Sequence, residues 1–135
     1  MAQWLGFFGV RRPPNWFKEG LGDHLAGLGG VGVTDAEAIA SIRNGRHFLL
    51  EERGGIMNSL HEAILAAGLE PVMFHQQTKM FVDFLWERDP VVFEGIVSDV
   101  LDGETIESSI TARAGVGIEA VWGEFESKIA NNEGG

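Results

Sequence analysis

Apolar residues recur along most of this chain at steps of three and four, the spacing that places them on one face of an α-helix. The longest such run spans residues 72–87. Its shared face carries Phe74, Phe81, Phe84 and Leu85. The two-residue alternation of a half-buried strand does not persist, and RHFLLEE at 46–52 is the one short strand candidate. The pattern therefore predicts a mainly helical protein.

Two later segments repeat the helical spacing. The first is opened by Pro90 and ended by Gly103, and its stripe consists of Val92, Phe93, Ile96, Val97, Val100 and Leu101. The last predicted helix has a stripe that consists of Ile118, Val121, Trp122, Phe125 and Ile129. Residues 131–135, NNEGG, are expected to form a frayed tail.

Capping residues mark several of the predicted helix starts. Thr34 with Glu37 three residues later forms a capping box, and Asp89 before Pro90 is a cap followed by proline in the first turn. The other predicted helices span residues 15–26, 35–44, 58–67 and 104–114. These signals predict one compact, mainly α, multi-helix domain over residues 1–135, without an internal repeat or linker.

Composition narrows the range of partners. The chain has 135 residues, no cysteine and a net charge of -10. The missing cysteines exclude disulfides and thiolate metal sites, and the negative charge argues against nucleic acid or an anionic membrane as the main partner. No apolar run is long enough to span a bilayer. Residues 1–12, MAQWLGFFGVRR, are apolar enough to need a partner surface, and we expect them to be the truncated end of a helix.

Two sequence motifs match functional patterns only formally. GLGGVG at 27–32 fits the dinucleotide-binding pattern, but a helix precedes it where that chemistry needs a strand, so it is interpreted as a flexible loop that ends a helix. HEAIL at 61–65 begins like the zinc motif HExxH, but Leu65 occupies the place of the second histidine. His61 and Glu62 are therefore expected to face solvent.

Glu19, Asp23 and His24 form the remaining cluster of candidate metal ligands. Glu19 and Asp23 are one helical turn apart, whereas His24 points mostly elsewhere. Two carboxylates on one helix make a poor zinc site by themselves, because zinc prefers nitrogen and sulfur ligands in tetrahedral geometry. The simpler explanation of Glu19 is a carboxylate in the first turn of a helix opened by Pro14 or Asn15, where it offsets the helix dipole.

The segment RRPPNWFKEGLGDH at 11–24 resembles the gluzincin zinc metallopeptidases, the thermolysin-like and aminopeptidase-like clan. The similarity continues in FHQQTKMFVDFLWERDP at 74–90 and in the C-terminal stretch from 96 to 129, so that it covers roughly residues 8–130. The resemblance implies the fold of the C-terminal helical subdomain of those peptidases. It also implies that Glu19 is the third zinc ligand and that Asp23 braces a zinc-bound histidine. His75 stands near an aromatic position of the family and is a candidate hydrogen-bond donor to the transition state.

The chain departs from this family at the catalytic centre. The family takes two histidine ligands and the catalytic glutamate from an HExxH helix that precedes the Trp-x-x-Glu segment, and the chain contains no HExxH. Gly22 also replaces the usual alanine after Glu-Gly-Leu, and Gly117 replaces a capping serine. We therefore expect an incomplete or degenerate zinc metallopeptidase-like domain that binds no zinc by itself and is inactive alone. In a complete protein, its substrate would be a peptide or protein.

An interaction module is the alternative function. In this case the helical scaffold would bind a peptide, a partner subunit or a second copy of the chain through an exposed apolar surface. That surface is expected to consist of Trp4, Leu5, Phe7, Phe8, Trp16 and Phe17. A third reading, in which Glu19, Asp23 and His24 form a complete metal site, conflicts with helix geometry and ligand number.

Overall fold

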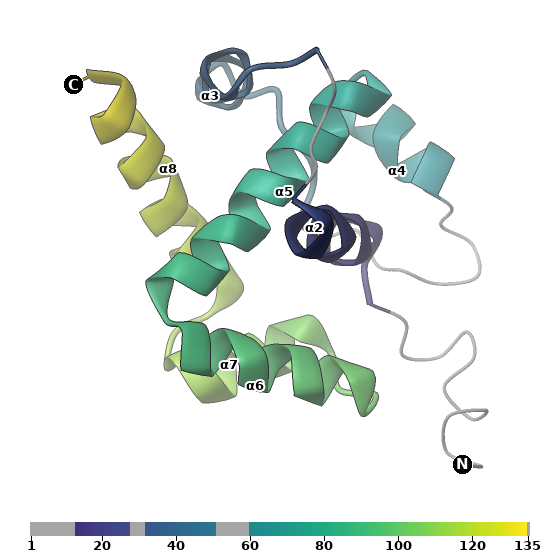
Figure 1. Ribbon diagram of the computed structural model, residues 1–135, viewed down its shortest axis with the longest axis vertical. Helices are drawn as coiled ribbons and strands as arrows, with labels where there is room; N and C mark the ends of the chain where they lie inside the picture. Colours follow the sequence, from purple (N-terminus) through teal and green to yellow (C-terminus); the bar gives the residue numbers. More distant parts are fainter. Residues whose placement is uncertain (1–12, 28–31, 51–59, 135) are drawn as a thin grey trace.

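Helix α5 (Pro71–Arg88) runs through the centre of the fold, and the other helices pack around it (Figure 1). The computed structural model describes residues 13–27, 32–50 and 60–134. Over these residues it contains seven helices and no strand. The helices other than α5 are α2 (Asn15–Ala26), α3 (Asp35–Arg43), α4 (Leu60–Ala67), α6 (Pro90–Leu101), α7 (Ile106–Ala114) and α8 (Ile118–Gly134). The predicted mainly α fold is confirmed.

Aromatic side chains from several helices form the core. The face of α5 predicted from the sequence is buried, and so are the predicted residues of α8 from Val121 to Ile129. The ring of Phe81 lies 5.3 Å from that of Trp16 and 5.1 Å from that of Trp122, measured between centroids. These contacts join α2, α5 and α8 around one cluster, at distances typical of favourable aromatic pairs.

Local signals place most helix ends correctly. The Thr34 hydroxyl accepts a hydrogen bond from the backbone N–H of Glu37 and the Glu37 side chain returns to Thr34, so the capping box is present. Asp89 accepts hydrogen bonds from the first turn of α6. Gly27 ends α2 with a left-handed φ of 72°, which confirms this part of the glycine-rich segment as a helix stop. Residues 28–31 of that segment lie outside the described residues.

Other expectations are wrong. Residues 46–50 of the strand candidate form an irregular segment, and residues 51 and 52 lie outside the described part. Leu101, assigned to the apolar stripe of α6, is 73% exposed, although Val100 in the same last turn is buried. Helix α8 continues through most of the residues expected as a frayed tail.

Buried Gln77 explains why the segment that contains Phe48 is irregular. Its side-chain oxygen accepts a hydrogen bond from the backbone N–H of Phe48 at 3.1 Å. Its amide donates to the carbonyl of Arg46 at 3.0 Å and to the hydroxyl of Ser41 at 3.2 Å. Because a glutamine on α5 satisfies these backbone groups, the segment needs no strand partner.

Helix α2 makes its most extensive contacts with α5 and crosses it closely (Figure 1). Gly20 allows this approach, since it lies against the backbone of α5 at Thr78 and the side chain of Val82. The crossing positions Glu19, Asp23 and His24 on α2 beside His75 and Asp83 on α5. Among the described residues, no helix is long and apolar enough to cross a bilayer.

Candidate functional site

Glu19 lies on α2, half-buried and beyond the first helical turn. Helix α2 begins at Asn15 with Pro14 as its N-cap, so Glu19 is the fifth helical residue and no acidic residue occupies the first turn. The explanation of Glu19 as a first-turn carboxylate is therefore wrong, because the dipole effect falls off within that turn. Within the described part of the chain, no hydrogen bond or ion pair holds the Glu19 carboxylate.

Asp23, one turn after Glu19, is bonded to a histidine from the neighbouring helix. Its carboxylate oxygen lies 3.0 Å from Nδ1 of His75 on α5. An ionised carboxylate can only accept hydrogen bonds, so Nδ1 of His75 carries a proton. When the ring is neutral, its Nε2 presents a lone pair, and Nε2 becomes a donor only when the ring carries both protons.

A second histidine–aspartate pair joins the same two helices, with the histidine on α2 and the aspartate on α5. Nδ1 of His24 on α2 lies 2.5 Å from an oxygen of Asp83 on α5. Lys79 donates to the other oxygen of Asp83 at 2.6 Å. Each helix thus contributes one acid and one histidine, and the two pairs stabilise the crossing. His24 is directed to Asp83, so the structure does not group it with Glu19 and Asp23.

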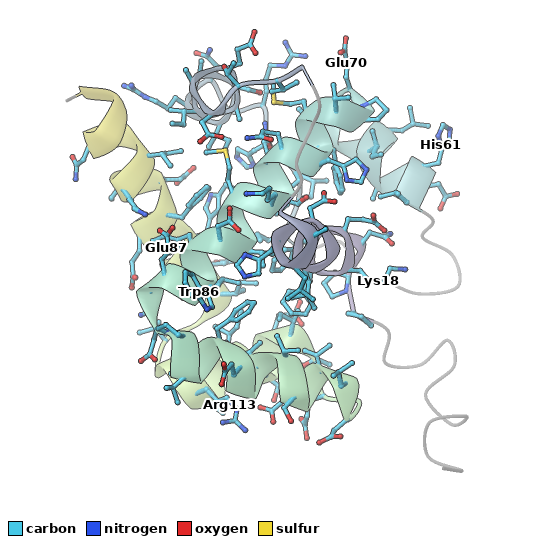
Figure 2. The ribbon with its side chains drawn as sticks, in the orientation of Figure 1. Lys18, His61, Glu70, Trp86, Glu87 and Arg113 are labelled. Carbon is cyan, nitrogen blue, oxygen red and sulfur yellow. The ribbon has the colours of Figure 1, made fainter. Side chains whose placement is uncertain are left out.

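Residues 13–27, 32–50 and 60–134 contain no group of three or more His, Asp or Glu side chains placed to hold one metal ion. His61 and Glu62, on α4, are exposed as expected, and Figure 2 shows His61 at the edge of the molecule. Glu19 is therefore a single candidate ligand, and Asp23 with His75 is a hydrogen-bonded pair beside it.

No family model, curated protein or solved structure matches the chain. None of these comparisons tests the gluzincin resemblance, which stays a prediction from the quoted motifs.

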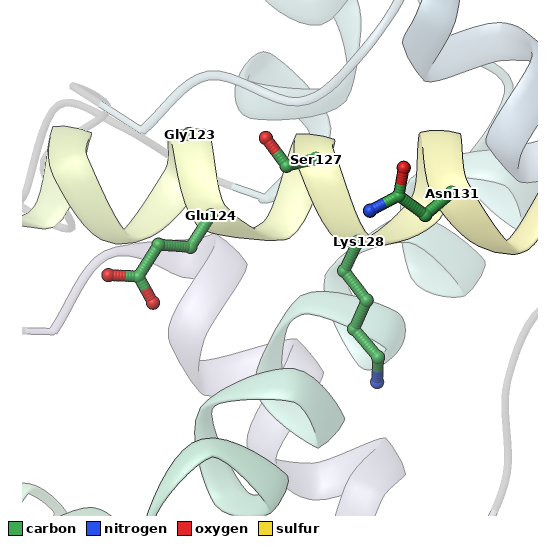
Figure 3. A pocket seen from close by; sticks show the side chains of 5 residues that line it. All are labelled: Gly123, Glu124, Ser127, Lys128 and Asn131. Atoms are coloured by element: carbon green, nitrogen blue, oxygen red, sulfur yellow. The ribbon is translucent and has the colours of Figure 1, made fainter.

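One surface hollow lies along α8 and is lined by Gly123, Glu124, Ser127, Lys128 and Asn131 (Figure 3). Its two charged side chains are already paired. Arg88 donates to Glu124 at 2.7 Å, which lowers the pKa of that carboxyl, and Lys128 donates to Glu87 at 2.7 Å. These contacts stabilise the packing of α5 on α8, and they leave no free charged group directed at a ligand in this hollow.

A second hollow, of about 250 Å³, is apolar and lies where α2, the end of α5 and α6 meet. We call it the apolar hollow, and its apolar lining consists of Leu21, Leu25, Trp86, Phe93 and Val97. His24 and Glu94 complete the lining. Leu25 is 74% exposed and Trp86 is 43% exposed, and Figure 2 shows Trp86 near the end of α5 that leads into α6.

The expected apolar surface is in part wrong. Trp16 and Phe17 are 0% and 1% exposed, because α2 turns this part of its surface toward α5 and the core. The other four expected members lie at 4–8, outside the described residues. The exposed apolar residues Leu25 and Trp86 were not singled out by the sequence, although a large apolar side chain followed by charged residues, as in WERD, is a weak local signal of exposure.

Proposed function

We propose that this chain is a zinc metallopeptidase-like domain that lacks part of its catalytic centre and does not hydrolyse peptides alone. The hydrogen bond between Asp23 and His75 carries the proposal. In the family that the chain resembles, the acid one turn after the zinc-binding glutamate braces a zinc-bound histidine from the HExxH helix. Asp23 has the spacing of that acid and accepts a hydrogen bond from a histidine, although this histidine comes from α5.

The pair limits what His75 can do. Since Asp23 accepts the hydrogen bond from the Nδ1–H of His75, a neutral His75 can accept a hydrogen bond at Nε2 or offer that nitrogen to a metal. The donor role that the resemblance implies requires the doubly protonated ring.

Glu19 is the one residue of this chain that we propose as a zinc ligand. Zinc would polarise a substrate carbonyl and activate a bound water when the two missing histidines are supplied. The chain's own contribution is to hold the Glu19 carboxylate on a rigid helix, which the Gly20 crossing fixes against α5.

Zinc titration of the purified chain tests this proposal. We expect no stoichiometric zinc binding by the chain alone; any residual binding should weaken in Glu19→Ala but not in Glu126→Ala, which changes an exposed carboxylate on α8. Tight binding of one zinc ion per chain, or peptide hydrolysis by the chain alone, would contradict an incomplete site. Identical titrations for Glu19→Ala and the unaltered chain would show that Glu19 is not a ligand.

A helical interaction module is the second candidate function, and the apolar hollow favours it. A cavity with an exposed tryptophan is a typical anchor site for a partner's apolar side chain. Size-exclusion chromatography with light scattering, run with and without Trp86→Ser, tests for a second copy at this surface. A monomer in both cases would exclude the homodimer.

A further inference from the structure

We infer that the apolar hollow binds the chain's own N-terminal segment, residues 1–12, through Phe7 and Phe8. The hollow is the surface that favours the proposed interaction module, and its occupant would be a segment of the same chain. This docking does not depend on zinc binding. Two observations from the described residues support it, the position at which the segment joins the fold and the chemistry of the hollow.

The segment joins the fold at the helix that lines the hollow. It is followed by Pro13 and Pro14, after which α2 begins at Asn15, and Pro14 has the extended backbone angles φ -64° and ψ 154°. From Asn15 to Leu25, α2 rises about 15 Å at 1.5 Å per residue. Phe7 and Phe8 precede Pro13 by six and five residues, so an extended chain places them up to about 17–20 Å from it. The two aromatic residues can therefore reach back along α2 to the hollow.

The composition of the segment complements that of the hollow. The hollow presents apolar side chains and the exposed carboxylate of Glu94. The segment carries the aromatic pair followed by Arg11 and Arg12, in a chain whose net charge is -10. Burial of the rings would remove both apolar surfaces from water, and the arginines would approach an acidic protein surface.

The chain contains no cysteine, so pairs of introduced cysteines can test this docking without interference. Gly6→Cys next to the aromatic pair is combined with Glu94→Cys at the hollow. The control combines Gly6→Cys with Glu70→Cys, an exposed site at the other end of α5 (Figure 2). Disulfide formation under mild oxidation is followed on non-reducing gels and by mass spectrometry, which distinguish a link within one chain from a link between two.

We expect the Gly6/Glu94 pair to close within one chain about tenfold faster than the control pair, because docking raises the local concentration of one thiol at the other. Leu25→Asp should remove this advantage, whereas Leu65→Asp, at a leucine on α4 that is 64% exposed, should keep it. Equal rates for the two cysteine pairs would overturn the inference and leave the hollow to a separate partner. A Gly6/Glu94 link formed mainly between two chains would also overturn it, since the occupant would then belong to a second copy.

Discussion

Gly20 on α2 lies so close to Thr78 on α5 that a Cβ added at Gly20 would be 2.6 Å from the Thr78 carbonyl oxygen. The same atom would be 2.7 Å from a methyl group of Val82. Because the nearest obstacle is backbone, a rotamer change cannot relieve the clash. The close crossing of the two helices thus depends on the absence of a side chain at this position.

Gly20→Ala should destabilise the fold by about 1–3 kcal/mol, the usual cost of overpacking a well-packed interior. Gly22→Ala is the matched control, since nothing lies within 4 Å of an added Cβ there. Alanine at this exposed helical position should stabilise the fold by up to about 1 kcal/mol. Urea denaturation monitored by circular dichroism measures both. Similar stabilities for the two variants would mean that α2 and α5 do not cross this closely.

Gln77→Leu tests the buried amide that organises residues 46–48. Leucine matches the glutamine in size but leaves the buried N–H of Phe48 without this partner, whereas the carbonyl of Arg46 still accepts a hydrogen bond from the hydroxyl of Ser41 at 2.6 Å. A buried polar group left unpaired costs about 1–3 kcal/mol, so the free energy of unfolding should fall by about that amount. Ser41→Ala removes a smaller part of the same network and should cost less. The reverse order of the two losses in urea denaturation would contradict the role assigned to Gln77.

The hydrogen bonds of Asp99 predict that the free energy of unfolding depends on pH in the acidic range. Hydrogen bonds from Arg113 and Ser109 lower the pKa of Asp99 from 3.8 to about 2. A carboxyl whose pKa is lower in the folded chain stabilises the fold in its ionised form, so its contribution is complete above about pH 4 and disappears as the pH falls toward 2. The stability difference between the unaltered chain and Asp99→Asn should therefore narrow from pH 5 to pH 2.

Glu126→Gln is the control for this pH series, because Glu126 is an exposed carboxylate on another helix, α8. Its stability difference from the unaltered chain should change less over the same range. Urea denaturation at each pH measures both differences. If the stability difference between the unaltered chain and Asp99→Asn does not change with pH, the hydrogen bonds from Arg113 and Ser109 do not stabilise the ionised carboxylate of Asp99.

Helices could be predicted from the sequence because their signals are local. The buried face of α8 and the capping box at Thr34 depend on residues within a few positions of one another. The course of the segment at Phe48 could not be predicted, since Gln77 lies 29 residues away and an isolated apolar run such as HFLL fits a strand equally well.

The candidate site shows the same division between local and long-range information. The one-turn spacing of Glu19 and Asp23 follows from their positions on one helix. The partners of the two histidines do not, because His75 is 52 residues from Asp23 and Asp83 is 59 residues from His24. The resemblance named His75 and Asp23 separately and gave no reason to pair them. The burial of Trp16 likewise depends on the crossing of α2 over α5.

Asp23→Ala should change which ring nitrogen of neutral His75 carries the proton, and it should also change the stability of the fold. In the unaltered chain the carboxylate requires the proton on Nδ1, so long-range proton–nitrogen NMR spectra should show the Nδ1–H form of neutral His75. Without Asp23 this preference should disappear. Asp83→Ala is the matched control, since it should change the signals of His24 and leave those of His75 unaltered. If the Nε2–H form of His75 dominates in the unaltered chain, Asp23 does not brace this histidine, and the proposed metallopeptidase-like function loses the observation that carries it.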